Sequence, residues 1–368
     1  MKPNAIIVRY GEISLKGKNR GRFEALLKRD IEQQLKNQGC HFSLVSRQHG
    51  RIYVHGVDAT TADLKRVLGI YSTSPAFEID KDYERLKKTV RRLLPFIGQP
   101  ASFRVSCQRV DKYFFPDSME TEKEIGALIH EATAIPVNLN TPEFNLQIEI
   151  GHRHIYIFFE KIAGFLGMPF GSAGKLVSLI SGGIDSPVAT FLMMKRGVRP
   201  VLLHYEIDTR TTRKVEKLTR KLEEYAAGNA LKLIVVPREE IFAGKFNRLY
   251  QSRYQDYLCL ICKYLMHRGA NEIARRERAL GVITGDNLAQ VASQTLNNLL
   301  AQRSAGQFPI YSPLIAYEKK ETIELARRIG TYDLSIEATP GCTPPPHPKT
   351  KVTRQRLEAI LQETGFLD

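Results

Sequence analysis

One stretch in the middle of the chain constrains the fold more than any other, because it joins a strand, a glycine turn and a helix. Residues 176–180 have the apolar character of a buried strand, which stops at the Ser-Gly-Gly of residues 181–183. Pro187 suits a first helical turn, where its missing N–H has no helical partner anyway, and residues 188–195 have helical spacing. Glycines let backbone N–H groups approach an anion, and the helix N-terminus adds partial positive charge. The stretch therefore predicts a phosphate-binding turn.

The residues of this turn indicate which phosphate it binds. The loop used by kinases needs Gly, four residues and then Gly-Lys-Ser/Thr, which residues 169–176 do not supply. Ser-Gly-Gly-Ile-Asp-Ser at residues 181–186 resembles instead the pyrophosphate loop of ATP pyrophosphatases, which cut ATP between its α and β phosphates and adenylate a substrate. An ordinary strand-to-helix turn is the alternative, and a match at six positions makes it the weaker one. The resemblance implies that Asp185 acts through Mg²⁺ or orients the loop. It also implies that pyrophosphate is held by Ser181, Gly182, Gly183 and Ser186.

The residues after this turn repeat the strand and helix rhythm of a doubly wound α/β domain with a parallel sheet. Further strands are expected at residues 200–205, 231–236 and 279–284, with helices between them. Ligands of such folds bind where strands end. Those ends carry the glycine turn, His204-Tyr205 and Gly285-Asp286, although His204 could equally be a structural histidine.

Composition narrows the class of protein. The 368 residues are 43% hydrophobic, which is enough for two or three domains with cores of their own. No apolar run approaches the ~20 residues of a membrane span, and no signal peptide is visible, so we expect a cytoplasmic protein with no membrane partner. The net charge of +15 favours a polyanionic partner, with nucleic acid first. An odd count of five cysteines favours thiol or metal chemistry over structural disulfides.

The N-terminal half predicts two small α+β units. Residues 1–58 alternate strand, helix and hairpin, and residues 59–165 begin with a short helix at 59–68 and include a basic helix at 82–94. The strand at residues 103–110 and the closing hairpin resemble a THUMP domain, an RNA-binding module. Residues 166–174 form the linker to a C-terminal domain of residues 175–368. The candidate RNA contacts, for which a solvated surface is the alternative, are Lys16, Lys18, Arg20, Arg22, Lys88, Arg91, Arg92 and Arg104.

The segment at residues 282–296 is the most specific after the glycine turn, and with it the whole chain resembles the tRNA 4-thiouridine synthetase (ThiI) family. The resemblance, which is to a short form without a rhodanese domain, implies an N-terminal ferredoxin-like domain, a THUMP domain and a pyrophosphatase domain. It implies ATP-dependent adenylation of O4 of uridine 8 in tRNA, release of pyrophosphate, and replacement of the oxygen by sulfur. It further implies Mg²⁺, a homodimer, and a cysteine desulfurase or another sulfur donor. Some relatives also serve thiamine thiazole formation.

The resemblance carries over to particular residues. Cys342, in a Pro/Gly-rich loop, corresponds to a persulfide-bearing cysteine. Lys263 stands where the family often has Arg, and a lysine cannot form the planar fork of a guanidinium. Besides the glycine turn, the positions that correspond to ATP-binding residues are Leu179, Ile180, His204, Tyr205, Lys263, Gly285 and Gln294.

The cysteines leave three alternatives open. Cys259 and Cys262 form a Cys-x-x-Cys pair, and with Cys342 they could hold a [4Fe–4S] cluster with one iron open for sulfide. Zinc is the rival, with His267 or His347 as fourth ligand, and a reduced or disulfide-bonded pair is the third reading.

Two other functions compete with 4-thiolation. One is another enzyme with the same loop, such as a tRNA 2-thiolation enzyme or an amidating synthetase. The cysteines argue against amidation, and a different modified nucleoside would indicate 2-thiolation. The other is a catalytically silent RNA-binding protein, against which the intact loop argues.

Overall fold

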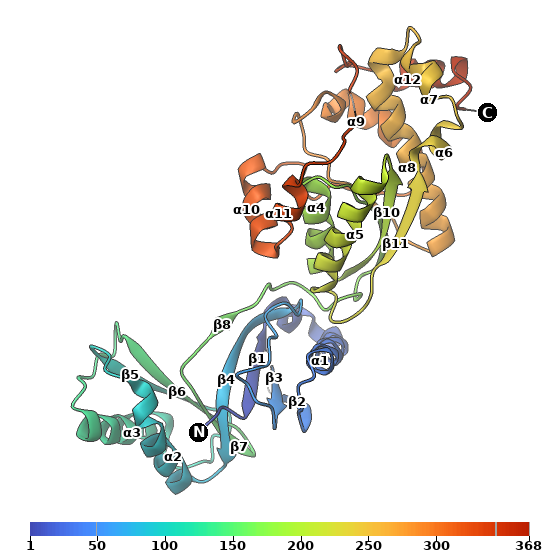
Figure 1. The fold of residues 1–368 in the computed structure, drawn as a ribbon. Coiled ribbons are helices and arrows are strands. Elements are labelled where there is room, and N and C mark those ends of the chain that lie inside the picture. The colour runs from blue at the N-terminus through green and yellow to red at the C-terminus, as the bar shows by residue number, and fades with distance from the viewer. Residues whose placement is uncertain (49, 343, 368) are drawn as a thin grey trace. The chain divides into compact units, whose positions relative to one another are not determined.

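The computed structural model describes residues 1–48, 50–342 and 344–367, which form two compact units, Met1–Met168 and Pro169–Asp368 (Figure 1). The boundary between them falls inside the linker predicted at residues 166–174. The fold class predicted from the sequence is confirmed. None of the described helices is long and apolar enough to cross a membrane.

The described part of the first unit contains one eight-stranded sheet that runs through both of its halves. The strand order is β2-β3-β1-β4-β7-β6-β5, and β8 pairs with β4. Strand β4 pairs with β1 through its first residues and with β7 through its last, so it belongs to both halves. The division at residue 58 remains a prediction. The bounds are β1 Ala5–Tyr10, α1 Arg20–Asn37, β2 Leu44–Gln48, β3 Arg51–His55, β4 Ile70–Asp80, α2 Tyr83–Ile97, β5 Phe103–Arg109, α3 Ser118–Thr133, β6 Phe144–Ile150, β7 His154–Phe158 and β8 Ile162–Ala163.

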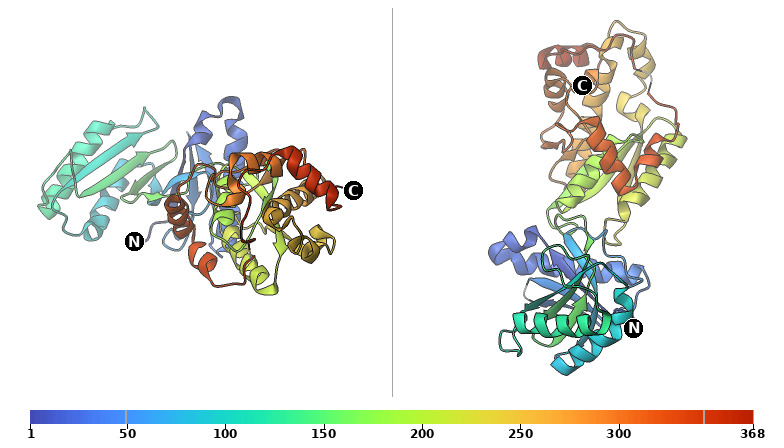
Figure 2. Two further views of the ribbon diagram at one scale, coloured as in Figure 1. Left: turned by 90° about the horizontal axis from the view of Figure 1, so that it is seen from above. Right: turned by 90° about the vertical axis from the view of Figure 1, so that its left-hand side faces the viewer.

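Three helices cover this sheet because each has an apolar face. Helix α1 buries Leu27, Ile31 and Leu35, spaced by four residues, in one core. Helices α2 and α3 lie side by side over the strands of the second half and share a second core (Figure 2). The Asp82 side chain begins α2 by accepting a hydrogen bond from Arg85 N at 2.6 Å.

The prediction of a helix at residues 59–68 is wrong, because these residues form turns and irregular structure. The Asp58 side chain accepts hydrogen bonds from the backbone N–H and the hydroxyl of Thr60, which forms a turn in place of a helix start. The apolar residues that suggested the helix, Leu64, Val67 and Leu68, are buried from turns instead.

The second unit contains a parallel sheet of order β11-β10-β9-β12-β13 among its described residues. On β9, Val177 packs in a core with Ala270 and Ala274 of α8, whereas the next residue, Ser178, contacts Thr190 of α4 at 2.7 Å. Since neighbouring strand residues point to opposite faces, α8 covers one face and α4 the other. The bounds are β9 Gly174–Leu179, α4 Asp185–Lys195, β10 Val198–Glu206, α5 Thr209–Glu223, β11 Lys232–Pro237, α8 Leu258–Glu277, β12 Val282–Ile283 and β13 Ile310–Tyr311.

A helical cluster continues this unit beyond the sheet. The first half of α8 packs there with four further helices around Phe242, Leu249, Ile261 and Leu357. Two other helices pack on α4 and α5. The cluster consists of α6 Arg238–Phe242, α7 Phe246–Tyr250, α9 Leu296–Arg303 and α12 Arg354–Glu363, and the two others are α10 Lys319–Ile329 and α11 Tyr332–Ile336.

Candidate active site

The glycine turn closes on itself through serine side chains. Ser186 Oγ accepts a hydrogen bond from Ser181 N at 2.9 Å and lies 3.1 Å from Ser181 Oγ. Helix α4 begins at Asp185, two residues before the predicted start, so Pro187 sits within its first turn. These contacts fix the turn in a strand-to-helix geometry suited to an anion.

A buried lysine, Lys214, packs against the glycine turn. The ideal Cβ position of Gly182 lies 3.1 Å from Lys214 Cδ, so a side chain there would press on that lysine. Lys214 Nζ donates to the backbone oxygens of Ser335 and Glu337, both at 2.7 Å. Lys214 therefore ties the turn to the C-terminal end of α11, and burial lowers the pKa of Lys214.

A cavity of about 230 Å³ opens beside the turn, and it is lined by most of the residues predicted to bind nucleotide. Four others line it as well: Met266, His267, Thr284 and Asp286. Gly182, His204 and Tyr205 are not among the lining residues. The predicted residues that line it are Leu179, Ile180, Ser181, Gly183, Asp185, Ser186, Lys263, Gly285 and Gln294.

The second wall of the cavity touches the turn directly. The ideal Cβ position of Gly285 lies 2.9 Å from Ser186 N and 3.1 Å from Asp185 C. Real Cβ atoms do not approach backbone this closely, so glycine is required here for steric reasons.

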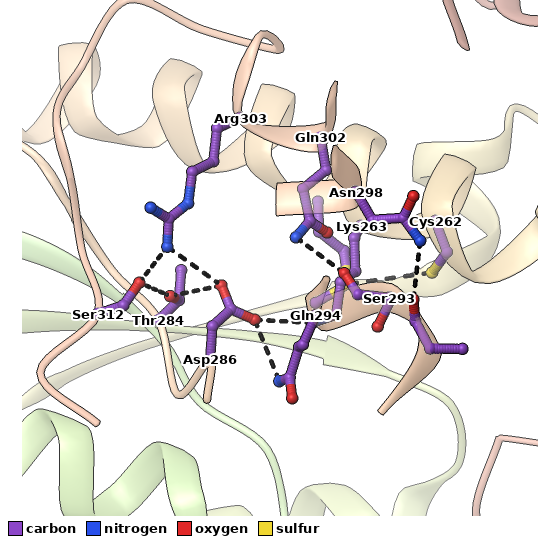
Figure 3. A network of polar contacts seen from close by, with 12 residues as sticks. Cys262, Lys263, Thr284, Asp286, Ser293, Gln294, Asn298, Gln302, Arg303 and Ser312 are labelled. Carbon is purple, nitrogen blue, oxygen red and sulfur yellow. Dashed lines mark hydrogen bonds and ion pairs between the residues drawn. The ribbon is translucent and has the colours of Figure 1, made fainter. Parts of the chain in front are cut away.

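Asp286 is the centre of the polar network behind this wall (Figure 3). Its carboxylate is 2.7 Å from Lys263 Nζ and 2.8 Å from Thr284 Oγ1, and Gln294 Nε2 lies at 3.4 Å. Arg303 approaches the same carboxylate at 3.9 Å and donates to Ser312 Oγ at 2.5 Å. Burial alone would raise the pKa of Asp286, but the ion pair with Lys263 and these hydrogen bonds hold that pKa at about 2. The carboxylate therefore orients Lys263 and Gln294.

The sequence did not indicate two residues of the candidate site, one paired with a cavity carboxylate and one lining the cavity itself. Lys319 Nζ, in the first turn of α10, lies 2.6 Å from Asp185 Oδ1. No local pattern links two residues so far apart in the chain. His267 was considered only as a zinc ligand, but it is 2% exposed and lines the cavity. Burial lowers the pKa of His267 to about 4, so its imidazole is neutral at pH 7.

His204 and Tyr205 direct their side chains into packing contacts. His204 Nδ1 lies 3.1 Å from Ile180 O, and its Nε2 has no partner among the described residues. The Tyr205 hydroxyl donates to Met266 O at 3.0 Å, and its ring lies against Gly269. At the end of β10 the Tyr205 hydroxyl is therefore engaged, whereas His204 Nε2 is a polar atom without a partner among the described residues.

The three candidate sulfur residues lie near one another. Cys259 and Cys262 are in the first two turns of α8, and burial together with the neighbouring Cys342 raises the pKa of the Cys262 thiol to about 12. Burial and Cys342 also raise the pKa of Cys259. Among residues 1–48, 50–342 and 344–367, no group of His, Cys, Asp or Glu side chains is arranged to hold a metal ion. His347 is exposed. The residues as placed thus do not fit a zinc site or an iron–sulfur cluster.

The predicted RNA contacts fall into two groups. Arg20 is paired with Glu24 at 2.8 Å and Arg104 donates to Leu139 O at 3.0 Å, while Lys16 lies over the Phe23 ring. These three side chains therefore make contacts within the first unit. The exposed members of the set are Lys18, Arg22, Lys88, Arg91 and Arg92.

Comparisons with known proteins identify the family of this chain. The family model described as thiamine biosynthesis protein (ThiI) matches residues 171–366, and the models of the ThiI ferredoxin-like domain and the THUMP domain match residues 5–74 and 80–160. A probable tRNA sulfurtransferase of Thermococcus kodakarensis is 39% identical over 343 residues, covering 90% of this chain and 89% of the relative. One of Brevibacillus brevis is 38% identical over 379 residues, covering 99% and 92%.

Solved structures show the same similarity. The crystal structure of a 4-thiouridine synthetase–RNA complex with bound ATP superimposes with a TM-score of 0.89 and 32% identity, covering 100% of this chain and 96% of that one. PH1313 from Pyrococcus horikoshii superimposes with a TM-score of 0.69 and 27% identity, covering 89% and 99%.

The depressed pKa of Asp286 predicts a pH-dependent contribution to stability. The Asp286 carboxyl has a pKa of about 2 in the folded protein and an ordinary pKa of 3.8 when unfolded. Its contribution to stability is therefore complete above pH 3.8 and is lost as the pH falls towards 2. We expect Asp286→Asn to lower the free energy of unfolding by about 2 kcal/mol at pH 7. The difference in unfolding free energy between the parent protein and Asp286→Asn should shrink below pH 4. Urea unfolding at pH 7, 4 and 3 measures it. The exposed Asp333→Asn serves as control. A deficit that stays constant down to pH 3 would contradict this assignment.

Proposed function

This chain belongs to the family described as thiamine biosynthesis protein (ThiI), and we propose that its glycine turn and the adjoining cavity carry out the ATP-dependent step of that family's reaction. The protein is an ATP-dependent tRNA sulfurtransferase that makes 4-thiouridine. The observation that supports this placement of the site is that the residues corresponding to the family's ATP contacts line one cavity against the turn.

The turn and cavity suit adenylation. O4 of the target uracil attacks the α-phosphorus, the bond to the bridging oxygen breaks, and pyrophosphate leaves with its electron pair. The N3 proton is lost, so the product is a neutral imidate joined to AMP. Backbone N–H groups of residues 182–184 and the start of α4 receive the pyrophosphate. Lys263 supplies positive charge in the cavity, and Lys319 supplies it beside Asp185.

Asp185 is the carboxylate we propose for Mg²⁺. Its partner is the partly exposed Lys319, which can turn towards a phosphate, and Mg²⁺ prefers one or two carboxylates together with phosphate oxygens. Asp286 is less suitable, because Lys263, Thr284 and Gln294 already occupy its oxygens. Bound Mg²⁺ would neutralise charge on the triphosphate.

Cys342 is the residue we propose to deliver sulfur as a persulfide. Its terminal sulfur attacks C4, the C4–O bond breaks, and AMP leaves with the oxygen. A thiol of the Cys259/Cys262 pair then attacks Cys342 Sγ. This step releases 4-thiouridine and leaves a disulfide, which an external thiol reduces. The exposure of Cys342 suits loading by a cysteine desulfurase or another persulfide donor.

An iron–sulfur cluster on the three cysteines is the competing arrangement, and the thiols as placed do not support it. An absorption spectrum of protein purified without oxygen separates the two. Visible charge-transfer absorption together with stoichiometric iron would favour the cluster. The absence of both would favour the persulfide.

The partners follow from the substrate. tRNA carries the charge that the exposed basic residues of the first unit match, and we propose that a homodimer binds it, as the family resemblance implies. Sedimentation of the protein with and without tRNA tests the dimer.

The close approach of Gly285 predicts that one methyl group is enough to damage ATP binding. Gly285→Ala should displace the backbone of residues 185–186 and lower affinity for ATP at least about tenfold, equivalent to about 1.4 kcal/mol. Calorimetric titration measures this. Gly126→Ala is the control, because no atom lies within 4 Å of the added carbon. Equal affinity in both variants would show that the contact is not needed.

The two chemical steps predict separable defects. Asp185→Asn should lower tRNA-dependent pyrophosphate release by at least about a hundredfold. Cys342→Ser should keep pyrophosphate release and yet form no 4-thiouridine, measured by nucleoside mass spectrometry. Cys40→Ser should behave like the parent protein. Full product from either Asp185→Asn or Cys342→Ser would refute the role given to that residue.

The exposed basic residues predict salt-dependent RNA binding. Replacing Arg91 and Arg92 by Gln should reduce the slope of log affinity against log salt by about 1 for each lost phosphate contact. Filter binding of tRNA at several salt concentrations measures the slope. Arg213 and Arg220, exposed on α5, are the matched pair for control. An equal reduction of the salt slope in the Arg91/Arg92 and Arg213/Arg220 double variants would contradict a specific role of α2 in RNA binding.

A further inference from the structure

Arg238 approaches the sulfur of Cys342 from a different part of the chain. Its Nη1 donates to Cys342 Sγ at 3.7 Å, a normal distance for a hydrogen bond to sulfur. Arg238 is the first residue of α6, directly after the edge strand β11. Its charge also opposes the rise in the pKa of Cys262 that burial and Cys342 cause, so it reaches that thiol as well. One guanidinium therefore acts on two of the three sulfur atoms.

The guanidinium is held in place by packing. Its carbon lies 4.2 Å from the centre of the Phe246 ring, the shortest of the cation–π distances recorded for the described residues. The side chain is 17% exposed, and its Nε is buried without a partner within the described chain. The carboxylate nearest to it is that of Glu239, at 3.8 Å and largely exposed. The guanidinium is thus stacked, partly desolvated and weakly neutralised.

This environment suits a sulfur anion. Arginine stays charged at any relevant pH and donates in a fixed plane, so stacking on Phe246 fixes the direction of its N–H groups. A persulfide or thiolate anion beside it accepts a charge-assisted hydrogen bond. Lysine could supply the charge but not the stacked plane.

We propose that Arg238 is a positioning residue for sulfur transfer, which holds the Cys342 persulfide as an oriented anion. This rests on the role proposed for Cys342. The persulfide proton is lost to solvent, the anion attacks C4 of the adenylated uridine, and AMP leaves with the oxygen. Arg238 forms no covalent bond and remains charged throughout. Its effect is confined to the step after adenylation.

The test compares Arg238→Met and Arg238→Lys with the intact protein. We expect Arg238→Met to lower the rate of 4-thiouridine formation from preloaded persulfide about tenfold, the effect of one charge-assisted hydrogen bond, without changing tRNA-dependent pyrophosphate release. Alkylation of Cys342 by iodoacetamide at pH 7, followed by peptide mass spectrometry, should slow by a similar factor, with Cys40 as reference. Arg238→Lys should recover part of the rate. Arg248→Met, an exposed arginine on α7, is the matched control.

The outcomes for the Arg238 variants either support or overturn the proposed role of Arg238. Unchanged alkylation and unchanged 4-thiouridine formation in Arg238→Met would overturn the proposal, whereas an intact protein that makes no 4-thiouridine would overturn the function itself. If Arg238→Met does not fold, Phe246→Leu removes the stacking ring and keeps the charge. That variant should slow alkylation of Cys342 by a smaller factor, and no change there would also count against Arg238.

Discussion

The candidate site depends on one contact, in which the backbone at Gly285 lies against the backbone of Asp185 and Ser186 without room for a side chain. Strands β9 and β12 are parallel neighbours, so the segments that follow them leave the sheet at the same edge. The missing side chain lets these segments touch. The glycine turn then shares one cavity with Asp286 and Gln294, which lie on the second segment. A larger residue at 285 would separate the part that holds phosphate from the part that orients Lys263.

Helix α8 would join the two proposed chemical steps. Its first two turns carry Cys259 and Cys262, and the next residues, Lys263 and His267, line the cavity. At 1.5 Å per residue, Cys259 and His267 are about 12 Å apart along the helix axis. The helix is fixed at both ends, because its first half packs in the helical cluster and its second half on the sheet. A rigid helix of this kind keeps the thiol pair within a short distance of the cavity.

The sequence predicted the parts of this arrangement that are local. The glycine turn, its strand and its helix are contiguous, so their residue types and spacing were enough to place them. Tertiary contacts were not predictable in the same way. Lys319 reaches Asp185 across 134 residues, and Arg238 reaches Cys342 across 104. Neither lies in a motif. Tyr205 was placed at the right strand end, but the direction of its side chain is set by packing against α8, which no local pattern records. The helix predicted at residues 59–68 failed because the Asp58 side chain competes for the backbone that the helix would use.

The charges of the cavity are compatible with the ATP proposed to bind there, although two carboxylates line it. The buried Asp286 is neutralised by the partly exposed Lys263, and the hydrogen bond from Thr284 further holds the carboxylate in place. Asp185 and Lys319 differ, because both side chains are partly exposed and water can replace each partner. In the proposed function, a triphosphate with Mg²⁺ would offer a better partner to each of them, since the cation would bind the carboxylate and a phosphate would bind the lysine. Of the two ion pairs, we therefore propose that the more exposed one exchanges on substrate binding. The less exposed one would remain as the fixed frame against which the substrate is oriented.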